Sequence, residues 1–263
     1  MFRKYLFFDL DGTLTDPMQG ITRSVQYALR HFGIEVEDLN ELCPFIGPPL
    51  TDSFRERYGM TDAEAAEAVA KYREYYAPKG IFENEVYPGI PGLLAATAAA
   101  GCVNVMATSK PTPFARQIAE HFGFEQHFRL ISGSTFDGTR TTKADVIRHA
   151  LGFLRIAPHQ AVMIGDRRYD IEGAAQTGLA SVAVGWGYAS PGELEAARPD
   201  HFVTDVAALR RLLIGPAEKA GFRGDSRPEC PGFSRRFSDG PTGALTICNH
   251  TLIGGGQHFI DFR

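Results

Sequence analysis

Residues 7–16 read Phe-Phe-Asp-Leu-Asp-Gly-Thr-Leu-Thr-Asp and continue a short apolar run that starts at Tyr5. The run predicts a buried strand over residues 5–8, and the Asp-Gly pair predicts a tight turn directly after it. Residues i and i+2 of an extended chain point the same way, so Asp9 and Asp11 aim into one small space. Two like charges this close are unfavourable unless a cation lies between them or one carboxyl is protonated. The segment therefore indicates a metal-assisted or acid–base site, with a strand followed by a polar hairpin turn as the alternative.

The composition is typical of a soluble globular protein with about one or two domains. The chain has 263 residues, of which 44% are hydrophobic, enough to bury a full core. Its net charge of −4 gives no electrostatic reason to expect nucleic acid or an anionic membrane as a partner. No apolar run approaches the ~20 residues of a membrane helix, and Asp9 interrupts the N-terminal run too early for a signal peptide. We therefore expect a cytoplasmic protein.

The chain continues as a helical insert and then as alternating helices and strands. Asp16-Pro17 is a typical helix start and residues 61–64 carry a capping-box pattern, so residues 17–83 are expected to be all-helical. Strands separated by helices favour a parallel sheet that binds ligands beyond the carboxyl ends of its strands. The fold class is thus α/β with an all-α insert placed to cover the site. After the first strand, the apolar patterns predict strands over residues 102–108, 129–132, 161–164 and 180–184, and helices over residues 91–100, 112–122, 143–151, 171–177 and 205–213.

The tail, residues 215–263, departs from this alternation. It is rich in Gly, Pro, Arg and Ser up to residue 243, and residues 244–262 could form a hairpin. A disordered extension or a non-native sequence fits the composition equally well. We expect the tail to be dispensable for the chemistry.

Thr108 and Lys143 are candidate anion-binding residues. Thr108 ends a predicted strand, and the N–H groups after it open toward the next helix, which suits an anion. Helix capping by Thr108 or Ser109 is the alternative. Lys143 lies near the start of a helix, where the helix dipole disfavours a cation, so a nearby anion would explain its position. A solvated surface lysine is the alternative there.

Asp166 and Asp170 are candidate metal ligands. Residues 162–170 give a buried strand, a glycine that allows close backbone approach, and then two carboxylates four residues apart. This spacing can hold a hard cation such as Mg²⁺ between carboxylates, waters and a phosphate, whereas a helix cap followed by a dipole-favoured Asp is the alternative. The four segments occur together and in this order at predicted strand ends, which the separate alternatives do not easily produce.

Together, these segments resemble the motifs of the haloacid dehalogenase superfamily of hydrolases. The resemblance covers roughly residues 4–214 and rests on DLDGT at residues 9–13, on Thr108, on Lys143 and on GDRRYD at residues 165–170. The first and last motifs are highly specific in combination.

The resemblance implies a Rossmann-like core with a parallel sheet, formed by residues 1–16 and 84–214. Residues 17–83 resemble the α-helical cap domain of the phosphoglycolate phosphatase-like branch. Within that branch, three stretches are similar to bacterial 5'-nucleotidase-type members, namely residues 16–29, 45–50 and 139–147.

The resemblance also implies chemical roles. Asp9 would be the nucleophile that forms an aspartyl-phosphate, and Asp11 would be the general acid that later acts as base. Thr108 and Lys143 are implied as catalytic residues that hold the phosphoryl group. The full implied phosphate-binding set is Asp9, Leu10, Thr108, Ser109 and Lys143. The implied ligands of Mg²⁺ are Asp9, Asp11 through its backbone carbonyl, Asp166 and Asp170.

These roles narrow the reaction. Dehalogenases of the superfamily lack an acid at the position of Asp11, and residues 45–50 lack an arginine for the second phosphate of a mutase substrate. We expect a Mg²⁺-dependent phosphatase of small phosphate monoesters, with a nucleoside 5'-monophosphate first and 2-phosphoglycolate as the alternative. A sugar-phosphate mutase, a non-catalytic phosphometabolite-binding relative and a phosphoacceptor signalling domain are more distant alternatives.

The expected partner is a small phosphorylated metabolite, bound by a monomer or homodimer without nucleic acid or membrane. Candidate substrate contacts lie in the insert and in the core. Packing or turn formation explains each of them equally well: Thr22, Phe45, Pro48 and Arg140.

Overall fold

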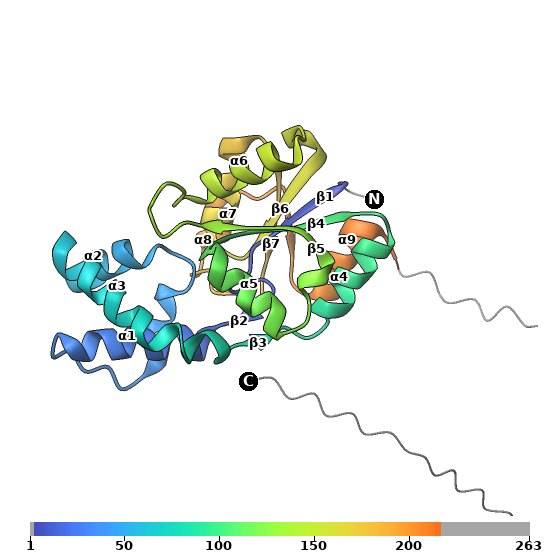
Figure 1. Ribbon diagram of the computed structural model, residues 1–263. Coiled ribbons are helices and arrows are strands. Elements are labelled where there is room, and N and C mark those ends of the chain that lie inside the picture. The colour runs from blue at the N-terminus through green and yellow to red at the C-terminus, as the bar shows by residue number, and fades with distance from the viewer. Residues whose placement is uncertain (1–2, 217–263) are drawn as a thin grey trace, which may run out of the picture. The chain divides into compact units, whose positions relative to one another are not determined.

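A six-stranded sheet forms the centre of the computed structural model, which describes residues 3–216 (Figure 1). The strand order is β5-β4-β1-β6-β7-β8, and every neighbouring pair is parallel. The expected α/β class and the five expected strands are confirmed with small shifts of their ends, whereas β8 was not expected. The strands are β1 (Tyr5–Phe8), β4 (Val103–Pro111), β5 (Phe128–Ser134), β6 (Ala161–Gly165), β7 (Ala180–Val184) and β8 (His201–Val203).

The central strand β1 is buried on both of its faces. Because successive side chains of a strand alternate, Phe7 packs into one apolar cluster while Leu6 and Phe8 join a larger one. The cluster around Phe7 is covered by α6 (Lys143–Leu154) and α7 (Arg168–Thr177). The other face is covered by α4 (Ile90–Ala99), α5 (Thr112–His121) and α9 (Val206–Ile214), as Figure 1 shows. The short elements of the core are α8 (Glu193–Ala197), η3 (Glu125–His127) and η4 (Pro158–Gln160).

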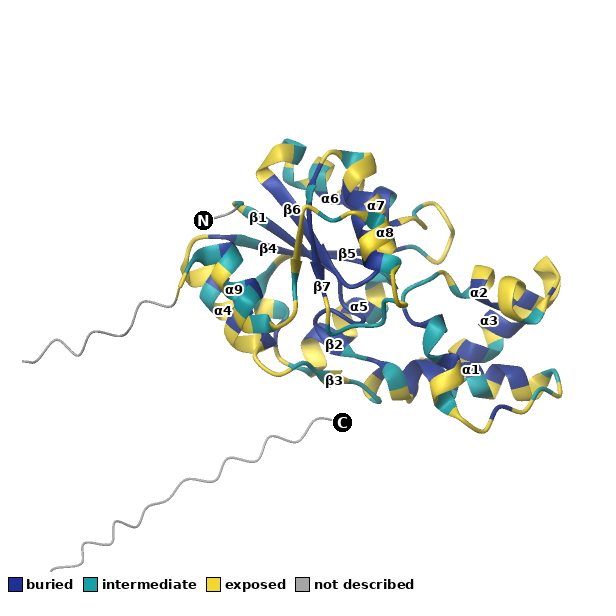
Figure 2. Cartoon of the chain, turned by 180° about the vertical axis from the view of Figure 1, so that it is seen from behind, coloured by how far each residue is buried: buried dark blue, intermediate teal, exposed yellow. Residues whose placement is uncertain are grey.

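The insert is helical, as expected. The side chain of Asp16 accepts the N–H of Met18 at 3.0 Å, and Thr61 forms the expected capping box with Glu64. The first and third helices pack together through buried faces, which Figure 2 shows in dark blue. The elements are α1 (Met18–His31), η1 (Leu39–Phe45), α2 (Leu50–Tyr58), α3 (Asp62–Tyr76) and η2 (Gly80–Phe82).

Two short strands join the insert to the core. β2 (Thr15–Asp16) and β3 (Glu85–Val86) pair antiparallel, with Thr15 opposite Val86. Neither strand was expected, because two residues are too few to show an apolar pattern. The boundaries of the core and cap domains stay a prediction, and this ladder lies beside both junctions.

The remaining expectations concern the tail and the membrane. Apart from Gly215 and Pro216, the tail with its possible hairpin lies outside the described residues. Within residues 3–216, no helix has both the length and the apolar character needed to cross a bilayer.

Candidate active site

Three buried carboxylates meet at the carboxyl ends of β1 and β6. Asp9 follows β1 and Asp166 follows β6, and the N–H of Asp9 donates to the carbonyl of Ile164 at 2.9 Å, which holds the two strand ends together. Asp170 comes from the first turn of α7. One carboxylate oxygen of each aspartate lies within 4.8 Å of those of the other two. The fold thus brings together the three side chains that the sequence predicts as metal ligands.

The charge of this cluster fits a bound cation. Burial, together with the charges of Asp170 and Asp9, raises the pKa of Asp166 to about 8. Burial also raises the pKa of Asp170 to about 6, although Lys143 acts in the opposite direction. A cation would relieve this repulsion, and a donor set made only of carboxylate oxygens suits a hard ion such as Mg²⁺.

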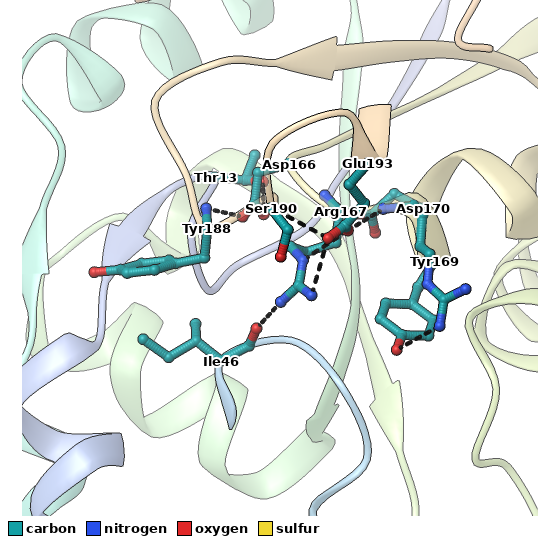
Figure 3. A network of polar contacts seen from close by, with 10 residues as sticks. Thr13, Ile46, Asp166, Arg167, Tyr169, Asp170, Tyr188, Ser190 and Glu193 are labelled. Atoms are coloured by element: carbon teal, nitrogen blue, oxygen red, sulfur yellow. Dashed lines mark hydrogen bonds and ion pairs between the residues drawn. The ribbon is translucent and has the colours of Figure 1, made fainter. Parts of the chain in front are cut away.

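Asp166 is held in place from two sides (Figure 3). Its Oδ1 accepts the hydroxyl of Thr13 at 3.0 Å and its Oδ2 accepts the N–H of Tyr188 at 2.8 Å. Gly12 has a φ of +82°, and a Cβ there would lie 2.2 Å from Asp166 Oδ2. The turn after Asp11 therefore requires glycine for both its backbone conformation and its close approach to this carboxylate.

Lys143 supplies a positive charge to the cluster. It is the first residue of α6, where Thr142 and Asp145 form a capping box. Its Nζ lies 2.9 Å from Asp9 Oδ1 and 2.7 Å from Asp170 Oδ1. Burial opposes the charge on Lys143, but the two carboxylates outweigh burial and raise its pKa. Lys143 is buried rather than solvated. The nearby anion expected from its position at the start of a helix is this pair of carboxylates.

Asp11 faces a different surrounding from Asp9. Its Oδ2 lies 2.8 Å from the Nζ of Lys110, and its buried Oδ1 has no hydrogen-bond partner among the described residues. Burial is the main influence and raises the pKa of Asp11, while Lys110 lowers it. The two oxygens of Asp11 thus differ, since a lysine fixes one and the other is buried and unpaired among the described residues.

Of the predicted phosphate-binding residues, Leu10 and Lys143 contact Asp9, whereas Thr108 and Ser109 line the same pocket as Asp9. Thr108 is buried near the end of β4, and its hydroxyl oxygen accepts the N–H of Lys110 at 3.2 Å. Because β4 runs on to Pro111, neither Thr108 nor Ser109 caps α5. The N–H of Leu10 donates to Asp9 Oδ1 at 2.8 Å, so this group orients the carboxylate.

A pocket extends from Asp9 and Asp11 to the insert. Phe45 and Pro48 belong to its lining, whereas the other two candidate substrate contacts do not. Thr22 is fully buried in α1 and donates its hydroxyl to the Met18 carbonyl at 2.6 Å. Arg140 donates through Nε to the Gly133 carbonyl at 2.6 Å. Packing and loop formation therefore account for these two side chains.

The model of the haloacid dehalogenase-like hydrolase family matches residues 6–184. The chain belongs to this family. A 5'-nucleotidase of Pseudomonas aeruginosa is 51% identical over 208 residues, which are 79% of this chain and 94% of that one. The crystal structure of a predicted phosphatase from Clostridium acetobutylicum has a TM-score of 0.78 at 47% identity and covers 80% of this chain and 98% of that one.

Two further relatives of this hydrolase have other names. The tyrosine-protein kinase PtkA of Mycobacterium tuberculosis is 45% identical over 183 residues, 70% of this chain and 62% of the kinase. A phosphoglycolate phosphatase of Chromobacterium violaceum is 30% identical over 222 residues, 80% of this chain and 96% of the phosphatase. The family match and the phosphatase relatives together identify this protein as a phosphoric monoester hydrolase.

Sequence reasoning missed several residues beside the site of this hydrolase. Lys110 stands two residues after Thr108 in the same strand, so the alternation of strand side chains could have placed it at the site. Tyr76 reaches Lys110 from α3, and its hydroxyl lies 2.5 Å from Nζ. Arg167 and Glu193 form a pair although they are 26 residues apart, and no sequence pattern predicts such a pair.

Proposed function

We propose that the protein is a Mg²⁺-dependent phosphatase that works through an aspartyl-phosphate and prefers nucleoside 5'-monophosphates. The observation that carries this proposal is the unequal surroundings of Asp9 and Asp11 at the head of one pocket. The Nζ of Lys143 holds Asp9 Oδ1 at 2.9 Å and so orients this carboxyl group, which suits a nucleophile. Asp11 also lines the pocket and has one oxygen without a hydrogen-bond partner among the described residues, which suits proton transfer.

In the first step, Asp9 Oδ2 attacks phosphorus while Lys143 and the N–H of Leu10 hold Oδ1. The bond from phosphorus to the leaving oxygen breaks, and Asp11 gives its proton to that oxygen. The Thr108 hydroxyl would donate to a phosphoryl oxygen, and the positive charge of Lys143 would stabilise the phosphoryl group. Mg²⁺ held by Asp9, Asp166 and Asp170 would offset the repulsion between the Asp9 carboxylate and the phosphate.

In the second step, Asp11 takes a proton from water, whose oxygen attacks the phosphorus of the aspartyl-phosphate. The bond between phosphorus and Asp9 breaks, inorganic phosphate forms, and the Asp9 carboxylate returns. Asp11 is then protonated again, ready for the next substrate.

The pocket supports a neutral, planar leaving group. Its buried cation, Lys110, is already paired with Asp11. Arg73, an exposed cation of the lining, lies over the Phe136 ring. The walls include the aromatic side chains of Phe45 and Phe114. A nucleoside suits these surroundings better than the carboxylate of 2-phosphoglycolate, and the 51% identical relative is named 5'-nucleotidase.

A phosphate-release assay on the full chain tests the proposal, with UMP, IMP, 2-phosphoglycolate and sugar phosphates as substrates. We expect the highest kcat/KM with a nucleotide, reversible loss of activity in EDTA, and no turnover by Asp9→Asn. Exposed Asp137→Asn is the matched control. Full activity of Asp9→Asn would refute the nucleophile, and a preference for 2-phosphoglycolate would refute the substrate class. A stable phosphoprotein without turnover would instead indicate a phosphoacceptor protein.

A further inference from the structure

Arg167 connects the turn between β6 and α7 of the core to the insert (Figure 3). It directly follows Asp166, and its side chain is buried although it does not line the pocket. Its Nη1 donates to the carbonyl of Ile46, in the segment between η1 and α2. A buried arginine of the core is thus bonded to the backbone of the insert.

Glu193 fixes the direction of this arginine. The Nε of Arg167 lies 2.8 Å from Glu193 Oε1, and its Nη2 lies 3.3 Å from Oε2. The same carboxylate accepts the N–H of Arg168 at 2.9 Å and that of Ser190 at 3.0 Å. A two-point contact of this kind orients the planar guanidinium, so the remaining nitrogen points at Ile46.

Gly47 allows the insert to lie directly on Arg167. Its φ is +105°, and a Cβ there would lie 3.0 Å from both Cγ and Nη1 of the arginine. Phe45 and Pro48, on either side of this contact, line the pocket together with Asp9. The contact therefore sets where the wall formed by residues 45–49 stands relative to the nucleophile.

We propose that Arg167 is a positioning residue that seats residues 45–49 over the active site and thereby sets the affinity for the leaving group. The part about affinity rests on the proposed function, whereas the seating does not. Arg167 acts through Phe45 and Pro48, which face the bound molecule, and through Glu193, which holds it.

Hydrogen–deuterium exchange on the full chain tests the seating without reference to activity. We expect peptides that cover residues 42–54 to exchange about tenfold faster in Arg167→Met, because hydrogen bonds to charged groups contribute about that factor or more. Arg168→Met is the matched control, since Arg168 is exposed and its side chain bonds the Tyr169 hydroxyl and lies over the Tyr169 ring. Unchanged exchange in Arg167→Met, or equal acceleration in Arg168→Met, would overturn the proposal.

Kinetics test the consequence for binding. We expect Arg167→Met to raise KM for a nucleoside monophosphate about tenfold, while kcat/KM for acetyl phosphate, whose leaving group is much smaller than a nucleoside, changes little. Equal losses on both substrates would show that Arg167 acts on the chemistry, against the proposal. If the wild type hydrolyses neither substrate, the proposed function fails, and the exchange result still decides the seating.

Two other variants make the test independent of how well Arg167→Met folds. Glu193→Gln keeps the shape of the side chain that contacts Arg167 but removes its charge. We therefore expect smaller changes in hydrogen–deuterium exchange and in KM than for Arg167→Met. Gly47→Ala disturbs the contact from the side of the insert, and its effect on KM should not add to that of Arg167→Met. Full additivity of the two substitutions would contradict a shared contact.

Discussion

Lys110 and Asp11 form a buried ion pair with 2.8 Å between Nζ and Oδ2. The same Nζ lies 2.5 Å from the hydroxyl of Tyr76 in the insert. The carboxyl group assigned to proton transfer is therefore oriented by a lysine of the core that also contacts a helix of the insert.

Removing this lysine should shift the pH dependence of the reaction. Burial raises the pKa of Asp11 and Lys110 lowers it, so Lys110→Met should raise it further. In the proposed mechanism Asp11 must be protonated for the first step, hence the fall of kcat/KM at alkaline pH should move upward by about one to three pH units. Rates from pH 4 to 10 check this. Tyr75→Phe is the control, because Tyr75 lies in the same helix as Tyr76 but its hydroxyl bonds Glu83. If kcat/KM of Lys110→Met fell at the same pH as that of the wild type, the result would contradict the influence of Lys110 on Asp11.

Mg²⁺ should reverse the pH dependence of stability. Without metal, the pKa of Asp166 is about 8 when folded and about 4 when unfolded. The unfolded chain then loses its proton first, so stability is full below about pH 4 and is lost as pH rises through about 8. Bound Mg²⁺ favours the ionised form and should add about 2.7 kcal/mol at a hundredfold excess over Kd. Melting temperatures at pH 5, 7 and 8 with EDTA or Mg²⁺ measure both effects.

Asp166→Asn provides the control for this measurement. The variant removes one of three clustered charges, so its metal-free form should melt higher than the wild type at pH 8. It should also lose most of the response to Mg²⁺. An unchanged response would show that Asp166 does not bind the ion.

Lys143→Met should damage both stability and catalysis. It leaves the carboxylates of Asp9 and Asp170 buried without their cation, which typically costs about 3–5 kcal/mol. If Lys143 binds the phosphoryl group as proposed, its loss should lower kcat about 10²–10³-fold. Urea unfolding in EDTA and steady-state rates in Mg²⁺ separate the two effects. Lys79→Met, at an exposed lysine of the insert, should change neither quantity.

Ending the chain after Ile214 should leave the reaction intact. α9 ends at this residue, and Leu213 completes the packing of the helix against the sheet. We expect kcat/KM within about twofold of the full chain. A large loss of activity with an unchanged melting temperature would give the tail a part in the chemistry.

The sequence predicts what strand geometry dictates. Asp9 and Asp166 each follow a strongly apolar run, and parallel strands place their carboxyl ends at one edge, so their meeting could be foreseen. β8 could not be foreseen, because two of its three residues are exposed and give no apolar run. For Thr22 the sequence left a substrate contact and packing open, and in the fold its hydroxyl donates to the Met18 carbonyl one turn back.

Contacts between the core and the insert lie beyond sequence reasoning for a related reason. Lys110 with Tyr76, and Arg167 with Ile46, join segments whose separation along the chain follows no period. Their formation depends on how two packed units meet, which hydrophobic patterning within either unit does not specify.

The pairing of β2 with β3 brings the two ends of the insert together. Thr15 and Val86 sit opposite each other, so the chain leaves the core and returns to it at one place. The insert between Thr15 and Val86 thus connects two paired strands as a hairpin loop does. Another connection could start and end at the same two residues without a change in strand register. We therefore expect that another segment could replace the insert while Asp9, Lys143 and Asp166 keep their positions.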